Sequence, residues 1–325
     1  MNNKKHQSGF TLIELMVAIV LGLLITAAAM QLFLGGTISY RMQENVAEVQ
    51  DGGIFGMDYI TQQIQLANYG NSDNLALNDR TKQGGIIFTS GTSADKDVNI
   101  KSLVAGKKIE DRYLSHSSGE AGWSGLSNTT TASDQLTIQF LAPVDMINCE
   151  GEKVFKGDRV IQRYFLRSYN SKASDDSNVA SLGLACDANT PNAKTSVNND
   201  PSSLNGFGTS ESLGEIIIPR VDQLKIKVLA RNGSNYKYYT IKEYREIAES
   251  NRATSIDPPE IQLVKISALI RSQAKTQTNA INPAKSFTML GDSVALKTAS
   301  AGNNNRYARE VYETTIFLRN GYRES

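Results

Sequence analysis

The chain opens with a long apolar run that contains a single charged residue. Between Phe10 and Leu34 the only ionisable side chain is Glu14. About 20 apolar residues are enough to cross a bilayer as a helix, and Lys4 and Lys5 before the run favour a cytoplasmic N-terminus. A carboxylate inside the bilayer costs about 3 kcal/mol or more. We therefore expect this run to span the membrane and Glu14 to meet a partner charge.

The junction before the run is Gly9-Phe10-Thr11-Leu12-Ile13-Glu14, which resembles the processing site of type IV prepilins and pseudopilins. The resemblance implies that a prepilin peptidase removes a leader (residues 1–9) by cutting after Gly9, and then methylates the new amine of Phe10. A secretory signal cut near Ala27-Ala28-Ala29 and a plain membrane anchor are the alternatives. A signal core has only about 7–15 apolar residues, and neither alternative explains Glu14.

Glu14 has a specific role if the chain is a prepilin. Cleavage leaves a cationic amine on Phe10, and a small axial offset between subunits brings Glu14 of one chain opposite the amine of its neighbour. A buried unpaired charge is heavily penalised, whereas a hydrogen-bonded pair recovers much of that cost. We expect the pair to fix the register of subunits, as a buried polar residue does in a coiled coil. In the family, this position lets a subunit enter the growing filament.

The helical pattern continues past the membrane span of residues 10–34. Apolar residues recur at spacings of three and four, which predicts an amphipathic half over residues 35–69 that lies against a globular domain. The stripe consists of Ile38, Met42, Val46, Val49, Met57, Ile60, Ile64 and Ala67. Asn68-Tyr69-Gly70-Asn71 should end the helix. The pairs Gly35-Gly36 and Gly52-Gly53 either permit close packing or let the helix bend, and the sequence does not decide between these.

Residues 70–325 show alternating patterns instead of helical ones. We predict an α+β, pilin-like fold, in which the long N-terminal helix packs on a predominantly antiparallel β-sheet domain whose strands have one wetted face. Strands are predicted at 85–89, 134–140, 159–167, 224–229, 236–241, 261–270 and 312–318, and a short helix at 242–250. The polar stretches 71–83, 115–133, 169–213, 272–286 and 299–305 are expected to be exposed loops.

The cysteines Cys149 and Cys186 both lie in the part that would be exported. In an oxidising compartment they are expected to form a disulfide, worth about 4 kcal/mol in the chain-entropy model. The bond would tether the long polar stretch that contains Cys186. Two cysteines and two histidines, with His6 in the leader, are too few for a zinc site.

Catalytic chemistry is sparse in this chain, and we predict that it is not an enzyme. His116 is the only histidine outside the leader, and a surface position is expected for it rather than a Ser-His-Asp site. The sequence predicts neither a cofactor nor a metal. The residues Asp175, Asp176, Asp187 and Asn189 offer oxygen ligands to calcium, but without EF-hand spacing.

Nucleic acid is not favoured as a general partner, because the formal net charge is +1. Aromatic and basic residues do mix in 159–169, 236–245 and 319–323. Contact with DNA therefore stays open but unsupported, since a wetted strand face explains these stretches equally well.

Downstream segments resemble the PilW type of minor pilin. They are Asn148-Cys149-Glu150-Gly151, Leu184-Ala185-Cys186, the strand at 264–271 and the ending at 312–320. This resemblance implies a subunit that primes pilus assembly and helps form the pilus tip, for twitching motility, adhesion or DNA uptake. Its partners would be other minor and major pilins, a large non-pilin tip protein, the prepilin peptidase and the inner-membrane assembly platform.

The expected location is the inner membrane, in a single pass with the N-terminus in the cytoplasm, and then the extracellular pilus. A J-type pseudopilin of type II secretion is the nearest alternative, and it shares the anchor and an α+β domain. A membrane-tethered periplasmic binding protein is the alternative from another class.

Overall fold

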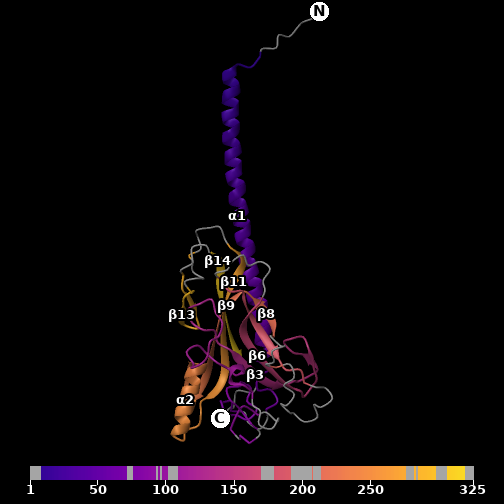
Figure 1. The fold of residues 1–325 in the computed structure, drawn as a ribbon, viewed down its shortest axis with the longest axis vertical. Helices are drawn as coiled ribbons and strands as arrows, with labels where there is room; N and C mark the ends of the chain where they lie inside the picture. Colours follow the sequence, from indigo (N-terminus) through magenta and orange to yellow (C-terminus); the bar gives the residue numbers. More distant parts are fainter. Residues whose placement is uncertain are drawn as a thin grey trace, which may run out of the picture.

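A long helix and a β-rich domain make up the structure. The computed structural model describes residues 9–71, 76–92, 94–95, 97–101, 109–169, 179–191, 207, 214–275, 282, 285–297 and 306–318. Helix α1 (Leu12–Ile64) has 53 residues and spans about 80 Å at the usual rise per residue. Its N-terminal half projects beyond the domain, and its C-terminal half packs against the sheets (Figure 1).

Helix α1 ends before Asn68, the residue at which the sequence predicts its end. Its C-cap is Gln65, and Asn68 and Gly70 adopt positive φ angles of 68° and 81° in the turn that follows. The backbone N–H of Asn68 donates to the carbonyl of Gln139 at 3.1 Å. The side-chain Oδ1 of Asn68 accepts from the N–H of Gly85 at 3.0 Å. Asn68 therefore bonds the turn after the helix to neighbouring segments of the domain.

The strands form two four-stranded antiparallel sheets. The first sheet has the order β3-β6-β7-β8, from β3 (Leu136–Leu141), β6 (Arg159–Ser168), β7 (Leu182–Ala188) and β8 (Glu215–Pro219). The second sheet has the order β10-β9-β11-β14, from β9 (Val221–Asn232), β10 (Asn235–Thr240), β11 (Glu260–Lys275) and β14 (Tyr307–Phe317). These pairings confirm the predicted α+β architecture of a long apolar helix on antiparallel sheets.

Shorter elements complete the domain. Two antiparallel pairs are β4 (Met146–Ile147) with β5 (Lys153–Val154), and β12 (Phe287–Met289) with β13 (Asp292–Val294). A parallel pair joins β1 (Ser90–Gly91) to β2 (Ile100–Lys101). A 3-10 turn, η1, covers Asp111–Tyr113, and helix α2 covers Ile241–Ala253. The helix predicted at 242–250 is thus confirmed, and a capping box of Thr240 and Glu243 fixes its start.

One core connects α1 to both sheets. It includes Ile60 and Ile64 of α1, Leu136 of the first sheet, and Val228 and Ile266 of the second, all at most 1% exposed. The C-terminal part of the predicted apolar stripe is therefore buried as expected, whereas Ile38, near the predicted membrane span, is exposed.

Strand β3 of the first sheet lacks the wetted face predicted for it. Leu136, Ile138 and Phe140 of β3 enter the main core, while Thr137 and Gln139 on the opposite face are also buried. Segments that precede β3 cover this second face. Thr137 Oγ1 donates to the carbonyl of Tyr113 at 2.6 Å, and Gln139 Nε2 donates to the carbonyls of Gly84 and Asn99 at 2.8 and 3.0 Å. These polar strand residues are thus buried because their side chains donate hydrogen bonds to backbone carbonyls of the irregular segments that cover β3.

Several predicted boundaries are wrong for related reasons. Residues 85–89 form only an isolated bridge, between Ile86 and Ile138, instead of a strand. The stretch 115–133 is packed rather than exposed, with Ser115, Asn128 and Thr129 buried. The longest predicted loop contains β7, every residue of which is buried. The part of 272–286 nearest β11 is strand, and 299–305 lie outside the described residues.

Candidate assembly site on the N-terminal helix

The start of α1 places Phe10 and Glu14 at the end of the helix farthest from the domain (Figure 1). Thr11 is the N-cap, and its hydroxyl accepts from the N–H of Glu14 at 3.3 Å. The carboxylate of Glu14 turns back and accepts from the backbone N–H and the hydroxyl of Thr11, each at 3.0 Å. The two residues form a capping box, which satisfies donors that a helix start otherwise leaves open. The pattern Thr-x-x-Glu in residues 11–14 could have predicted this box.

The capping box places a carboxylate in the first turn, close to the residue that cleavage after Gly9 would make N-terminal. Phe10 itself is 90% exposed. The predicted site residues Gly9, Phe10 and Glu14 therefore lie together and free of the domain. A neighbouring chain can reach Glu14 without rearrangement of the globular part.

The apolar half of α1 suits a bilayer. Among the described residues, α1 is the one helix long and apolar enough to cross a membrane, and its most apolar stretch is entirely unburied in the chain. Its hydroxyl groups are satisfied within the helix, because Thr26 Oγ1 donates to the carbonyl of Gly22 at 2.9 Å and Thr37 Oγ1 to that of Phe33 at 2.8 Å. Internal bonding of this kind is required where lipid offers no partners.

The docked half of α1 depends on two glycines. A Cβ atom on Gly53 would overlap the ring of Tyr312 in β14, and one on Gly56 would overlap the side chain of Ile218 in β8. By contrast, a Cβ on Gly52 or Gly35 would meet nothing within 4 Å. The question that the sequence left open is answered for Gly53, which allows close packing of α1.

An ion pair ties α1 to the corner between the two sheets. Arg220 alone separates β8 from β9, with a positive φ of 57°, and its guanidinium donates to Glu48 Oε1 at 2.5 Å. The other oxygen of Glu48 accepts from the backbone N–H of Gln273 in β11 at 3.1 Å. Glu48 thus links the helix to both sheets at once, and sequence patterns gave no indication of this contact.

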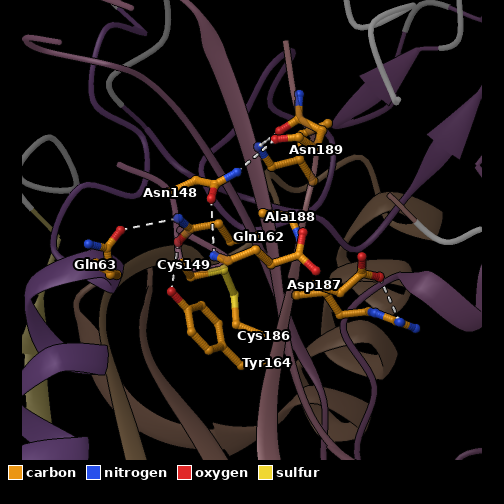
Figure 2. Close-up of a disulfide and its surroundings, with 12 residues drawn as sticks. Gln63, Asn148, Cys149, Gln162, Tyr164, Cys186, Asp187, Ala188 and Asn189 are labelled. Atoms are coloured by element: carbon orange, nitrogen blue, oxygen red, sulfur yellow. Dashed lines mark hydrogen bonds and ion pairs between the residues drawn. A yellow bond between two sulfur atoms is a disulfide. The ribbon is translucent and has the colours of Figure 1, made fainter. Parts of the chain in front are cut away.

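The predicted disulfide joins Cys149 to Cys186, with a Cα–Cα distance of 6.1 Å (Figure 2). It connects a tight turn to the buried strand β7, so Cys186 does not lie in a loop as predicted. Asn148 organises the turn: its Oδ1 accepts from the N–H groups of Glu150 and Glu152, at 3.0 and 2.9 Å. The bond therefore fastens the turn to a sheet that is already held by its own core.

The same region contacts the C-terminal end of α1. Tyr164 donates to Gln162 Oε1 at 2.7 Å, and Gln162 Nε2 donates to Gln63 Oε1 of α1 at 3.1 Å (Figure 2). The disulfide therefore lies in the sheet that these bonds join to the end of α1. It lies far from Glu14, at the opposite end of the helix.

His116 is 4% exposed, so the predicted surface position is wrong. Its ring stacks on Trp123 at a centroid distance of 4.8 Å. Nδ1 lies 2.7 Å from Glu120 Oε2, and Nε2 lies 2.7 Å from the carbonyl oxygen of Asp111. The histidine is buried because its loop pairs with Gln135 next to β3. Both ring nitrogens are occupied by these acceptors, and neither is directed at a serine hydroxyl.

The described residues considered as calcium ligands are engaged in other bonds. Asp187 accepts from Arg163 at 2.7 Å, and Asn189 bonds to the backbone of Ile161 and Arg159. Asp175 and Asp176 lie outside the described residues. Across the described ranges no group of three or more acidic, histidine or cysteine side chains could hold a metal ion.

The basic stretches considered for DNA differ from one another. In 159–169 the arginines Arg159 and Arg163 are buried. In 236–245 Tyr236 is exposed, but Arg245 donates to the carbonyls of Phe88 and Ser115. Residues 319–323 lie outside the described part of the chain. These contacts neither support nor test an interaction with DNA.

Comparison with known proteins addresses the N-terminal segment most directly. Residues 4–30 match the model of the prokaryotic N-terminal methylation motif. The chain carries a prepilin-type methylation motif. A type IV-like pilin from Thermus thermophilus is similar over 62% of this chain and 87% of its own length, with 12% sequence identity and a TM-score of 0.29. That TM-score is too low to establish a shared fold. No curated protein sequence matched the chain.

Proposed function

We propose that the chain is a type IV pilus minor pilin of the PilW type, which helps to prime pilus assembly and to form the pilus tip. The observation that carries the proposal is the methylation motif at residues 4–30, placed on a helix whose apolar half projects free of the domain. The domain stays on the periplasmic side while the helix holds the subunit in the membrane. After cleavage the same helix can move from lipid into a filament.

Glu14 supplies the charge that sets the register of a subunit as it enters the filament. The capping box with Thr11 keeps its carboxylate in the first turn of α1. In the filament we propose, this carboxylate pairs with the methylated amine of a neighbouring Phe10. Taking both charges out of water is costly, so the pair contributes register more than affinity. The partners are other minor and major pilins, a large non-pilin tip protein, the peptidase and the inner-membrane assembly platform. The chain acts through these contacts and not as an enzyme.

Two substitutions separate the charge of Glu14 from its capping role. Glu14→Gln keeps an acceptor for the capping box but removes the charge, whereas Glu14→Ala removes both. We expect both variants to fold, to stay in the membrane and to be lost from sheared filaments. Normal incorporation of Glu14→Gln would show that capping, and not charge pairing, is what assembly requires.

A deletion strain distinguishes the pilus from the secretion system. Loss of surface pili with normal export of proteins is the expected result. Loss of export alone would indicate a J-type pseudopilin of type II secretion. Loss of neither would favour a membrane-tethered periplasmic binding protein.

A further inference from the structure

The face of α1 that points away from the domain carries a regular pattern of side chains, which we call the outer seam. Its residues alternate at spacings of four and three: Phe33, Thr37, Tyr40, Glu44, Ala47, Asp51, Ile54 and Asp58. With about 3.6 residues per turn, the outer seam lies opposite the buried face that includes Val49, Gly53 and Ile60. The outer seam therefore runs from the membrane span down the back of the docked helix.

Half of the outer seam is apolar and open. Phe33, Tyr40 and Ile54 are 71%, 67% and 59% exposed, and Phe55 beside them is 72% exposed. Together with Ala47, the first three recur every seven residues. That repeat is the one by which helices pack side by side along a shared seam. Phe33 lies in the expected membrane span, where lipid accounts for its exposure. Tyr40, Ile54 and Phe55 lie outside that span, and large exposed apolar side chains there mark a surface that another protein covers.

Three of the other four residues of the outer seam are acidic, and this determines which helix can cover it. Glu44, Asp51 and Asp58 also recur every seven residues, and within the described part of the chain none of them makes an ion pair. Asp58 accepts from Gln62 of its own helix, at 2.8 Å. The outer seam therefore presents a row of carboxylates between its apolar residues.

A second copy of this chain is a poor occupant. Two copies anchored by their N-termini must run parallel, and Arg41 is the only basic residue of α1 between Gly35 and Ile64. Matching the apolar rows of two copies would bring acidic rows together, and like charges at an interface repel. A helix with lysine or arginine at the same spacing would instead pair with each carboxylate while its apolar residues cover Tyr40 and Ile54.

We propose that the outer seam docks the N-terminal helix of a different pilin-type subunit, one that carries basic residues at intervals of seven. This inference rests on the proposed function and goes beyond it, because it states the chemistry of the neighbour and disfavours a second copy. The seam accordingly places this subunit in a mixed complex and not in a filament of its own kind.

Photo-crosslinking in cells tests which helix lies on the outer seam. A benzoylphenylalanine replaces Tyr40 in the full chain, and the same residue at the exposed Tyr236 of β10 is the control. Mass spectrometry then identifies the joined peptide. A peptide from the N-terminal helix of another subunit with basic residues spaced by seven, seen from position 40 and not from position 236, is the expected result. A joined peptide from a second copy, or no joined protein at all, would overturn the inference.

Charge reversal tests the electrostatic half of the inference. The double variant Glu44→Lys/Asp51→Lys is compared with Glu152→Lys/Glu246→Lys, which changes the net charge equally at exposed domain positions. We expect the seam variant to enter filaments at least about fivefold less than the control variant. Equal incorporation of the two would overturn the inference while leaving the proposed function in place. A wild-type chain that is never cut after Gly9 would overturn both.

Discussion

The close approach of α1 to β8 predicts opposite effects for two nearby glycine substitutions. In Gly56→Ala the new Cβ would lie 2.6 Å from Cδ1 of Ile218, well inside the ordinary carbon contact of about 3.5–4.0 Å. Ile218 is 1% exposed and has no space to retreat. Overpacking of this kind costs about 1–3 kcal/mol, against about 1 kcal/mol gained by replacing a helical glycine. In Gly52→Ala the new Cβ meets no atom within 4 Å, so this variant should show only the stabilisation that comes from replacing a helical glycine.

The difference between the two variants isolates the packing term, because the helical gain is common to both. We expect Gly52→Ala to exceed Gly56→Ala in free energy of unfolding by about 1–3 kcal/mol. The measurement is denaturant unfolding of the full chain in detergent, followed by the fluorescence of Trp123, the single tryptophan. Equal stabilisation by both alanines would refute the close docking of α1 on β8.

Three further predictions concern the domain. Replacing Cys149 and Cys186 by serine should lower the free energy of unfolding by about 2–5 kcal/mol, and reductant should give the same loss in the wild type but none in the variant. Burial raises the pKa of Asp134 to about 7, against the backbone N–H groups of Ser118 and Ile226 that lower it. The folded state therefore holds the Asp134 proton more tightly than the unfolded state does. The contribution of this proton to stability is full below about pH 4 and disappears as the pH rises through 7. A carbon NMR titration of the Asp134 carboxyl with a midpoint near 4 would contradict this. Arg220→Met leaves Glu48 without its ion partner and should cost about 1–3 kcal/mol in unfolding experiments, an effect that Arg220→Lys should largely avoid.

Regular patterns predicted much of the fold. The span, the lower amphipathic stripe and helix α2 follow from helical periodicity, and β6, β9, β10, β11 and β14 follow from alternation. Strand β7 was missed because the small residues Gly183 and Ala185 stand where its alternation would need polar residues, although Leu182, Leu184, Cys186 and Ala188 enter the core. The polar sequence around it also suggested a loop.

Other features depend on contacts between distant residues. The burial of His116 requires Trp123 and Glu120 to close over it, and Gly53 needs the ring of Tyr312 from the last strand. At the candidate site, local sequence was more informative. Residues 9–14 predicted the processing site, which lies within the segment that matches the methylation motif. The Thr-x-x-Glu pattern in the same residues also indicates the capping box of Thr11.

The N-terminal peptide of the protein isolated from membranes or filaments tests the account most directly. Mass spectrometry should find a chain that begins at Phe10 and carries a methyl group on its α-amine. A chain that keeps Met1, or one that begins near Met30, would contradict the account, because Glu14 would then lack the cationic partner on which assembly depends.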